Sequence, residues 1–180
     1  MIHILISDPD VFVREGIKQM LANQADLHIA GETSQATETL QALRTCQSDV
    51  CIMEIAVDGY TGLGFLHEAK SHAPQTPILV MSHRAERDFA LRGIRAGASG
   101  VLGKSCGGQQ LTQAIRLAAQ RRLYLSETVC DLLARSVTQD EGGRRHEGLS
   151  DIEFDILAMM ASASSNAQIA HHCHISIAMA

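Results

Sequence analysis

Two kinds of apolar pattern alternate along the first two thirds of the chain, and this alternation constrains the fold more than any other feature. Short runs rich in β-branched residues occupy positions 2–7, 27–31, 50–53, 78–81 and 100–102. The segments between them carry apolar residues at helical spacing. In the first of these segments the predicted buried face consists of Val13, Ile17, Met20 and Leu21. Strands that alternate with helices form a parallel sheet covered on both faces. The sequence therefore predicts an α/β fold with a five-stranded, parallel, doubly wound sheet of the flavodoxin-like kind.

The last third of the 180 residues predicts a small all-α C-terminal segment joined through a linker. A helix is expected over 125–134, with Ser126 as its N-cap. Residues 136–148 are polar and hold three glycines, a composition typical of a flexible linker. Ser150 and Glu153 form a capping box at the start of a further helix. We therefore divide the chain into a domain at 1–122, a helix and linker at 123–148, and a helical segment at 149–180.

Several classes of protein are disfavoured by what the sequence contains. No stretch reaches the roughly 18 uncharged apolar residues of a membrane-spanning helix, and the N-terminus lacks the basic start of a secretory signal. The cysteine count is five, an odd number, and no pair is spaced CxxC, which favours free thiols in a reducing compartment. No glycine-rich nucleotide-binding motif follows a strand, so an enzyme is disfavoured. We expect a cytoplasmic protein that is neither an enzyme nor bound to a membrane.

Polar side chains stand where four of the predicted strands end. These are Asp8, Glu54, Ser82 and Lys104. The carboxyl ends of parallel strands meet at one edge of the sheet, where ligands of such folds bind. Two carboxylates, a hydroxyl and an ammonium group suit a phosphate or a Mg²⁺ ion. The alternative is that charges collect at strand ends only because strand ends meet solvent.

At these positions the chain resembles the receiver domain of two-component response regulators. Segments 13–17, 48–55, 78–82 and 96–104 match that domain in order. Residues 149–157 and 165–170 resemble the opening of the LuxR-type helix-turn-helix, so the whole chain is similar to the NarL/FixJ subfamily of transcriptional regulators. The resemblance implies a response regulator of a phosphorelay. Its implied partners are a second copy of the chain, a sensor histidine kinase or another regulator, and DNA.

The resemblance also implies a role for each residue of the pocket. In receivers an aspartate after the third strand accepts a phosphoryl group, and an acidic pair after the first strand holds Mg²⁺. A hydroxyl and a lysine contact the phosphoryl oxygens, which fits Ser82 and Lys104. An aromatic residue on the fifth strand swings inward on activation, and its position is taken by Val101.

The acidic positions depart from this pattern. Glu54 stands at the acceptor position, and Pro9 replaces the second metal-binding acid, leaving Asp8 and a displaced Asp10. The additional methylene of glutamate moves its oxygens by about 1.5 Å, and a misplacement of about 1 Å can cost on the order of 100-fold in rate. A Mg²⁺ site built from Asp8 and Glu54 is weakened accordingly, and Asp10 would contribute only if its loop bends inward. No other cofactor is indicated.

Two consequences for the receiver are open at this point. Glu54 could reach Lys104 and hold the domain in an active-like state without phosphate. Alternatively, the domain has lost its signalling chemistry and is inert. Both alternatives predict a regulator that works independently of phosphorylation.

The C-terminal segment carries only part of the DNA-binding module that it resembles. Its two helices match those that precede a recognition helix, and residues 175–180 match only the start of that helix. Asn166 and Ser176 are the candidate DNA contacts, but no lysine or arginine follows Arg145. DNA binding is therefore expected only if a longer chain supplies the recognition helix. The alternative function is a pseudo-receiver that binds other proteins and no DNA.

Overall fold

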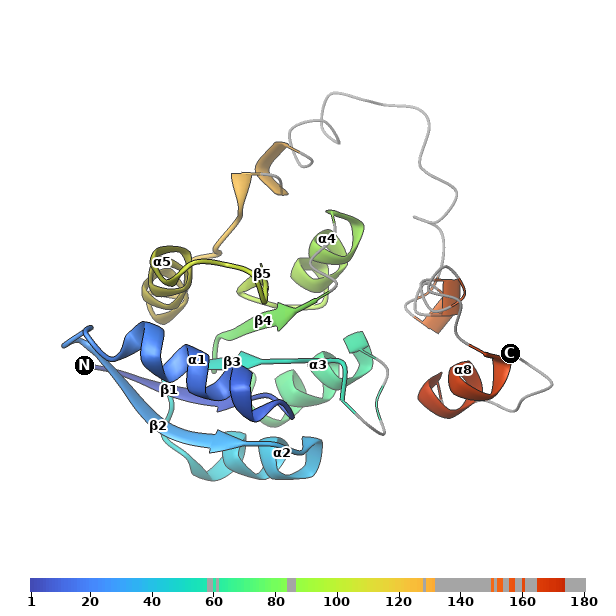
Figure 1. The fold of residues 1–180 in the computed structure, drawn as a ribbon, viewed down its shortest axis with the longest axis horizontal. Coiled ribbons are helices and arrows are strands. Elements are labelled where there is room, and N and C mark those ends of the chain that lie inside the picture. Colours follow the sequence, from blue (N-terminus) through green and yellow to red (C-terminus); the bar gives the residue numbers. More distant parts are fainter. Residues whose placement is uncertain are drawn as a thin grey trace.

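Five parallel strands form one sheet in the order β2-β1-β3-β4-β5 (Figure 1). The computed structural model describes residues 1–57, 60, 62–83, 87–127, 129–131, 150, 152, 153, 156, 157, 160 and 165–173. Its elements are β1 (Ile2–Ser7), α1 (Val11–Leu21), β2 (Leu27–Thr33), α2 (Ala36–Thr45), β3 (Val50–Met53), α3 (Gly62–His72), β4 (Ile78–Ser82), α4 (Arg87–Arg95), β5 (Gly100–Gly103), α5 (Gly108–Ala119) and α8 (Asn166–Cys173). The strand order is that of a flavodoxin-like doubly wound sheet, so the predicted fold class is confirmed.

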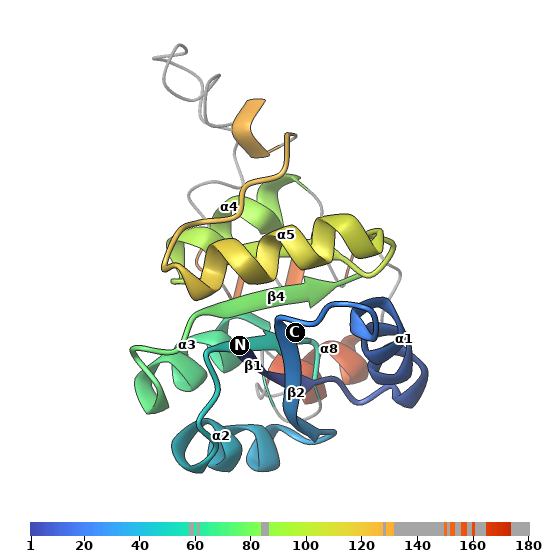
Figure 2. The same cartoon turned by 90° about the vertical axis from the view of Figure 1, so that its left-hand side faces the viewer.

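The sheet separates two hydrophobic cores, one on each face (Figures 1 and 2). Successive side chains of a strand point to opposite faces. Ile4 and Ile6 accordingly lie in the core under α1 and α5, whereas Leu5 lies in the core under α2, α3 and α4. The central strand β3 is buried at all four positions, because helices cover both of its faces.

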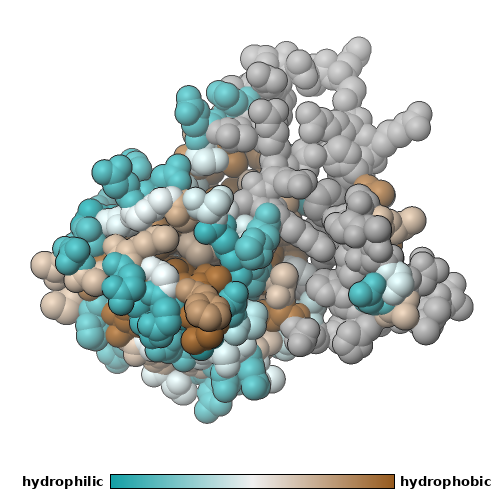
Figure 3. All heavy atoms as spheres, viewed as in Figure 1, coloured by the Kyte–Doolittle hydropathy of each residue, from teal (hydrophilic) through white to brown (hydrophobic). Residues whose placement is uncertain are grey.

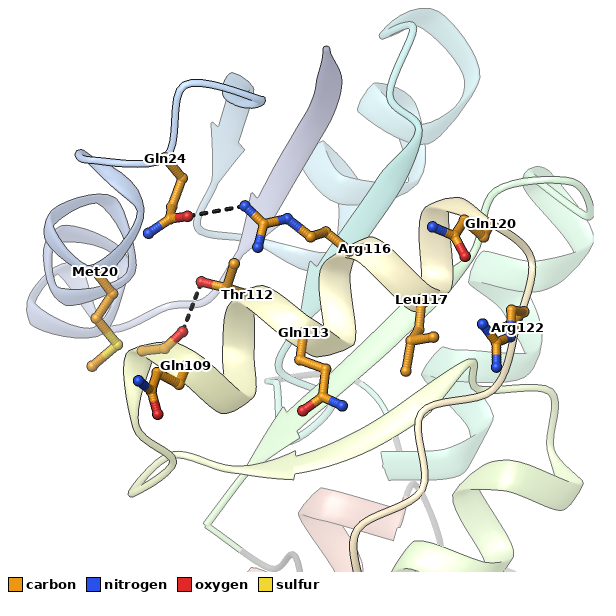
Figure 4. Close-up of a pocket in the computed structure, with 10 residues that line it drawn as sticks. Met20, Gln24, Gln109, Thr112, Gln113, Arg116, Leu117, Gln120 and Arg122 are labelled. Atoms are coloured by element: carbon orange, nitrogen blue, oxygen red, sulfur yellow. Dashed lines mark hydrogen bonds between the residues drawn. The ribbon is translucent and has the colours of Figure 1, made fainter.

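Helix α1 buries a narrower face than its spacing predicts. Ile17 and Leu21 are buried, but Met20 is 42% exposed. Met20 instead lines a cavity of about 440 Å³ that opens between α1 and α5 (Figure 4). The first turn of α1 leaves Val11 and Phe12 exposed, and Figure 3 shows a hydrophobic patch over this end of the helix.

Strand β2 is two residues longer than predicted. Glu32 and Thr33 continue the ladder because they pair with Ile6 and Ser7. The polar character of these residues hid the strand end from the search for apolar runs. The added pairs extend β1 and β2 together toward the carboxyl edge of the sheet, where the candidate site lies.

The C-terminal part is described at selected residues. The predicted capping box is confirmed: the Ser150 amide and hydroxyl donate to Glu153 Oε2 at 2.7 and 2.6 Å. Ser165 and Gln168 make the same arrangement before α8, at 2.8 and 2.9 Å. The predicted linker at 136–148 lies outside the described residues, and the division into 1–122, 123–148 and 149–180 stays a prediction. Across the described part of the chain, no helix is both long and apolar enough to cross a membrane.

Candidate functional site

The carboxyl edge of the sheet collects the four predicted pocket residues from four neighbouring strands. Asp8 directly follows β1, Glu54 follows β3, Ser82 ends β4 and Lys104 follows β5. Asp8, Glu54 and Ser82 are 2%, 3% and 2% exposed. These charges therefore do not meet solvent, which removes the alternative that they stand at strand ends only to be hydrated.

Lys104 lies between the two carboxylates. Its Nζ is 2.7 Å from Asp8 Oδ2 and 3.0 Å from Glu54 Oε2, and the lysine side chain is 8% exposed. Burial lowers the pKa of Lys104, but its hydrogen bonds to Asp8 and Glu54 outweigh burial, and the pKa lies above its ordinary value. The lysine is therefore charged at neutral pH and sets one positive charge against two negative ones.

The carboxylate oxygens that do not face Lys104 are held by backbone amides. Asp8 Oδ1 accepts from the amide of Asp10 at 2.8 Å. Glu54 Oε1 accepts from the amides of Ile55 and Ala56, each at 2.8 Å. All four oxygens thus have a donor inside the protein. Hydrogen bonds of this kind to a charged group are among the stronger ones in proteins.

Asp10 does not join the cluster. Its side chain accepts from the amide of Phe12 at 2.8 Å and caps the N-terminus of α1, at an exposed position. The loop does not bend inward to bring the candidate Asp10 into the pocket, because its carboxylate satisfies a helix amide that otherwise lacks a partner.

The arranged residues do not fit Mg²⁺. This ion needs near-octahedral oxygen ligands at about 2.0–2.1 Å. Pro9 provides no side-chain oxygen, and the oxygens of Asp8 and Glu54 already accept from Lys104 and backbone amides. Within the described residues, no group of three or more histidines, cysteines or acidic residues is placed to hold a metal ion.

Arg14 supports the site and was not found from the sequence. Its Nη1 donates to the backbone carbonyl of Asp8 at 2.7 Å, and its Nε lies 3.2 Å from Glu32 Oε2. Arg14 therefore ties the loop after β1 to the end of β2. The only sequence signal was a basic residue in the second turn of a helix that begins beside a strand end, which also fits an ordinary solvated arginine.

Hydroxyl groups beneath the loop form a second network that was missed. Thr39 Oγ1 lies 2.7 Å from Ser7 Oγ and 2.8 Å from Thr33 Oγ1. These contacts join the ends of β1 and β2 to α2. They fix the backbone just before Asp8, so the position of that carboxylate does not depend on its own ion pair alone.

The switch position is tightly packed. Val101 is 6% exposed, and a Cβ atom added to Gly93 of α4 would lie 2.9 Å from Val101 Cγ2. Helix α4 approaches β5 this closely only because residue 93 has no side chain. Valine has no ring to swing, and the contact with α4 is tight at Gly93.

The candidate DNA contacts are less completely described. Asn166 begins α8, in which Ile169 and Ala170 are 1% and 5% exposed. The buried pair shows that α8 packs on one side, as an amphipathic helix does. Ser176 lies outside the described residues, so neither candidate contact is tested.

The sheet order, the acidic residues after β1 and β3 and the lysine after β5 together define a receiver-type signalling domain. Residues 4–116, which are more than half of the chain, match the protein family described as "Response regulator receiver domain". The chain belongs to the response regulator receiver family.

Relatives share most of the chain. It is 29% identical over 163 residues to the response regulator GacA of Pseudomonas aeruginosa, covering 90% of this chain and 76% of the relative. It is 27% identical over 178 residues to the transcriptional regulatory protein LiaR of Bacillus subtilis, covering 98% and 84%. The first of these relatives is a response regulator by name, and the second is a transcriptional regulatory protein.

Solved structures agree on the fold. RcsB from Salmonella enterica serovar Typhimurium, bound to promoter rprA in the presence of phosphomimetic BeF3-, superposes with a TM-score of 0.74 at 22% identity and covers 99% of this chain and 86% of that one. A LuxR-family regulator from Aurantimonas has a TM-score of 0.70 at 24% identity, covering 77% and 99%. The family match over residues 4–116 and the response regulators among the relatives, rather than these structures, identify the chain as a response regulator of the two-component type.

Proposed function

We propose that this response regulator works without phosphorylation and that the Asp8–Lys104–Glu54 cluster takes the place of the metal ion and the phosphoryl group. The observation that carries the proposal is the buried Lys104 ammonium between two carboxylates, at 2.7 and 3.0 Å. Phosphoryl transfer to a carboxylate needs a free acceptor oxygen and a cation that neutralises the phosphoryl charge. In this site the oxygens are engaged and the cation is a lysine of the chain itself.

The energetic argument favours a permanently closed site. A donor or a metal ion would have to pull Lys104 away from at least one buried partner. Removing one member of a buried ion pair costs about 3–5 kcal/mol, because the other charge is left without compensation. Glu54 also places its negative charge beside Lys104 without phosphate, which supports an active-like state over an inert one.

The test is direct. The protein is incubated with acetyl phosphate and Mg²⁺ and its intact mass is measured. We expect an unchanged mass, and a phosphoryl addition that maps to Glu54 would contradict the proposal. A parallel sample of a typical receiver with an aspartate acceptor shows that the donor is active.

For partners, we propose a constitutive homodimer that acts on promoters in the cytoplasm, with a histidine kinase or another regulator as a further partner. The likeness to RcsB bound to a promoter supports the DNA step. Contact with DNA would use the helices at 149–180, including Asn166 and Ser176, in a chain that has a complete recognition helix.

A second candidate function is a pseudo-receiver that binds another protein and no DNA. The exposed start of α1 favours this function. Phe12 is 83% exposed and Val11 is 49% exposed, and a hydrophobic patch is visible over this end of the helix (Figure 3). An apolar patch beside the closed site is suited to a protein partner. Promoter-fragment binding by a chain that carries a complete recognition helix decides between the two functions: binding supports the transcription regulator, and no binding supports the pseudo-receiver. Phe12→Ser in the same chain shows whether DNA binding depends on the patch.

A further inference from the structure

The chain turns back after α5 and runs beside the edge of β5. Arg121 has a left-handed backbone (φ 58), and its amide donates to the carbonyl of Ala118 at 2.8 Å, which ends the helix and reverses the chain. Residues 123–127 and 129–131 follow, and we call them the strap. Figure 1 shows the strap, in orange, between the end of α5 and the side of the sheet that carries α4.

The strap contacts both cores. Tyr124 forms a bridge with Gly100, donates from its amide to the carbonyl of Ser99 at 2.8 Å, and packs in the core under α1 and α5. Val129 lies in the opposite core with Ala90 and Val101. Both side chains are buried, at 7% and 4% exposure. The strap therefore wraps around the open edge of β5 from one face of the sheet to the other.

A cavity of about 210 Å³ lies beneath the strap. It is bordered by Ala90 of α4, by Val101 and Leu102 of β5, by Cys106, and by Tyr124 and Val129 of the strap. The cavity adjoins the switch position, because Val101 borders it together with Tyr124 and Val129 of the strap. Burial raises the pKa of the Cys106 thiol, which slows its reaction with thiol reagents.

We propose that the strap is a conformational latch that holds α4 against β5 and couples this face to the residues beyond 131. When the strap is docked, Val129 completes the core under α4. When it is released, the edge of β5, the cavity and Cys106 open, and α4 loses its support. Val101 has no ring to swing, so in this proposal release of the strap takes the place of that movement. The latch does not require the site to be unphosphorylatable, so either proposal can fail alone.

The test uses the full chain with two strap variants and a matched control. Val129→Ala removes buried methyl groups, and Val129→Thr keeps the shape but buries a hydroxyl. Leu123→Ala changes a strap residue that is 53% exposed and serves as the control. Maleimide labelling of Cys106 is followed by peptide mass spectrometry, with half-buried Cys46 as the internal reference. Hydrogen exchange is measured at α4 and at β1 and β3.

In both Val129 variants we expect maleimide to label Cys106 about tenfold faster relative to Cys46, and hydrogen exchange in α4 to become faster. Exchange in β1 and β3 should not change, and Leu123→Ala should change neither labelling nor exchange. Unchanged Cys106 labelling would overturn the latch. Equal acceleration in α4, β1 and β3 would also overturn it, because the strap would then be an ordinary part of one cooperative core. A variant that does not fold counts as that second outcome.

Discussion

Two ion pairs of similar geometry lie at opposite ends of the receiver and differ in their contact with water. Lys104 meets Asp8 at 2.7 Å, with the side chains 8% and 2% exposed. Arg116 of α5 meets Asp26 at 2.7 and 2.8 Å, with the side chains 43% and 47% exposed. Arg116 also donates to Gln24 across the groove between α1 and α5 (Figure 4).

The difference shows that distance alone does not measure an ion pair. Solvent screens the Arg116 pair, and exposed pairs of this kind contribute little to stability. The Lys104 pair is shielded, so its charges depend on one another and the loss of one leaves the others unpaired. Only the buried pair can therefore define the state of the domain.

The largest effect is expected from breaking the buried cluster. Lys104→Met leaves two buried carboxylates without their cation and should lower the free energy of unfolding by about 3–5 kcal/mol, measured by urea titration. Adding Glu54→Gln to Lys104→Met should recover part of the loss, because it removes one unpaired charge. The matched control is Arg116→Met, for which we expect a small change. Equal losses for the two single variants would mean that burial does not separate the pairs.

The second effect concerns the metal ion. Glu54→Asp alone should restore little Mg²⁺ binding, since Pro9 still leaves the site one acid short. Glu54→Asp combined with Pro9→Asp should restore clearly more, because it provides acids in the pattern that receivers use. Isothermal titration with Mg²⁺ measures the difference, with Asp10→Asn as a control at the helix cap. Tight Mg²⁺ binding by the unchanged protein would show that Lys104 is easily displaced.

The contrast between the pairs also shows what sequence reveals. The fold was predictable because a strand that is buried on both faces leaves a continuous apolar run in the sequence, as β3 does. The positions of Asp8, Glu54 and Lys104 at one edge followed from the rule that parallel strands end together. Even the reach of Glu54 to Lys104 was among the predicted alternatives, and the structure places these groups 3.0 Å apart.

What the sequence did not reveal depends on loop conformation. Asp8 and Asp10 are two residues apart, yet Asp10 caps a helix and Asp8 pairs with Lys104. The path of the backbone decides which aspartate takes which role. The backbone amides that hold Glu54 carry no sequence signal, because every residue but proline has one. The helix predicted from 125 with Ser126 as its N-cap is confirmed at residues 127 and 129–131: the amide of Val129 donates to Ser126 Oγ at 3.4 Å and the amide of Cys130 to the Ser126 carbonyl at 2.9 Å. The sequence did not reveal the turn at Arg121, a left-handed residue that is not glycine, before Tyr124 and Val129 enter different cores.

A pH titration sharpens the comparison with smaller effects. The pKa of Lys104 in the folded protein is raised above 10.5. The stabilisation that its ion pairs give to the fold is therefore fully present below pH 10.5 and is lost as the pH rises through the pKa of the folded state. The penalty of Lys104→Met should therefore shrink above pH 10.5. The pKa of Asp26 is lowered from 3.8 by its hydrogen bond with Arg116, so its contribution is present above pH 3.8 and is lost as the pH falls through the folded value. The small penalty of Arg116→Met should vanish in acid, and urea midpoints between pH 2 and 11 test both directions.

The smallest expected effect is that of a phosphodonor, which should leave the dissociation constant of the dimer unchanged. If the buried cluster is already closed, no phosphoryl group forms to gate pairing, and any dimer forms constitutively. We expect a homodimer at micromolar concentration. A change of about 1.4 kcal/mol in the free energy of association would shift its dissociation constant tenfold. Sedimentation equilibrium with and without acetyl phosphate and Mg²⁺ should give the same dissociation constant. Arg116→Met, at the other end of the receiver, should be equally indifferent to the donor. A monomer that pairs only after the donor is added would mean that the Lys104 cluster opens under phosphorylation, and that the buried pair behaves as a switch rather than as a fixed closure.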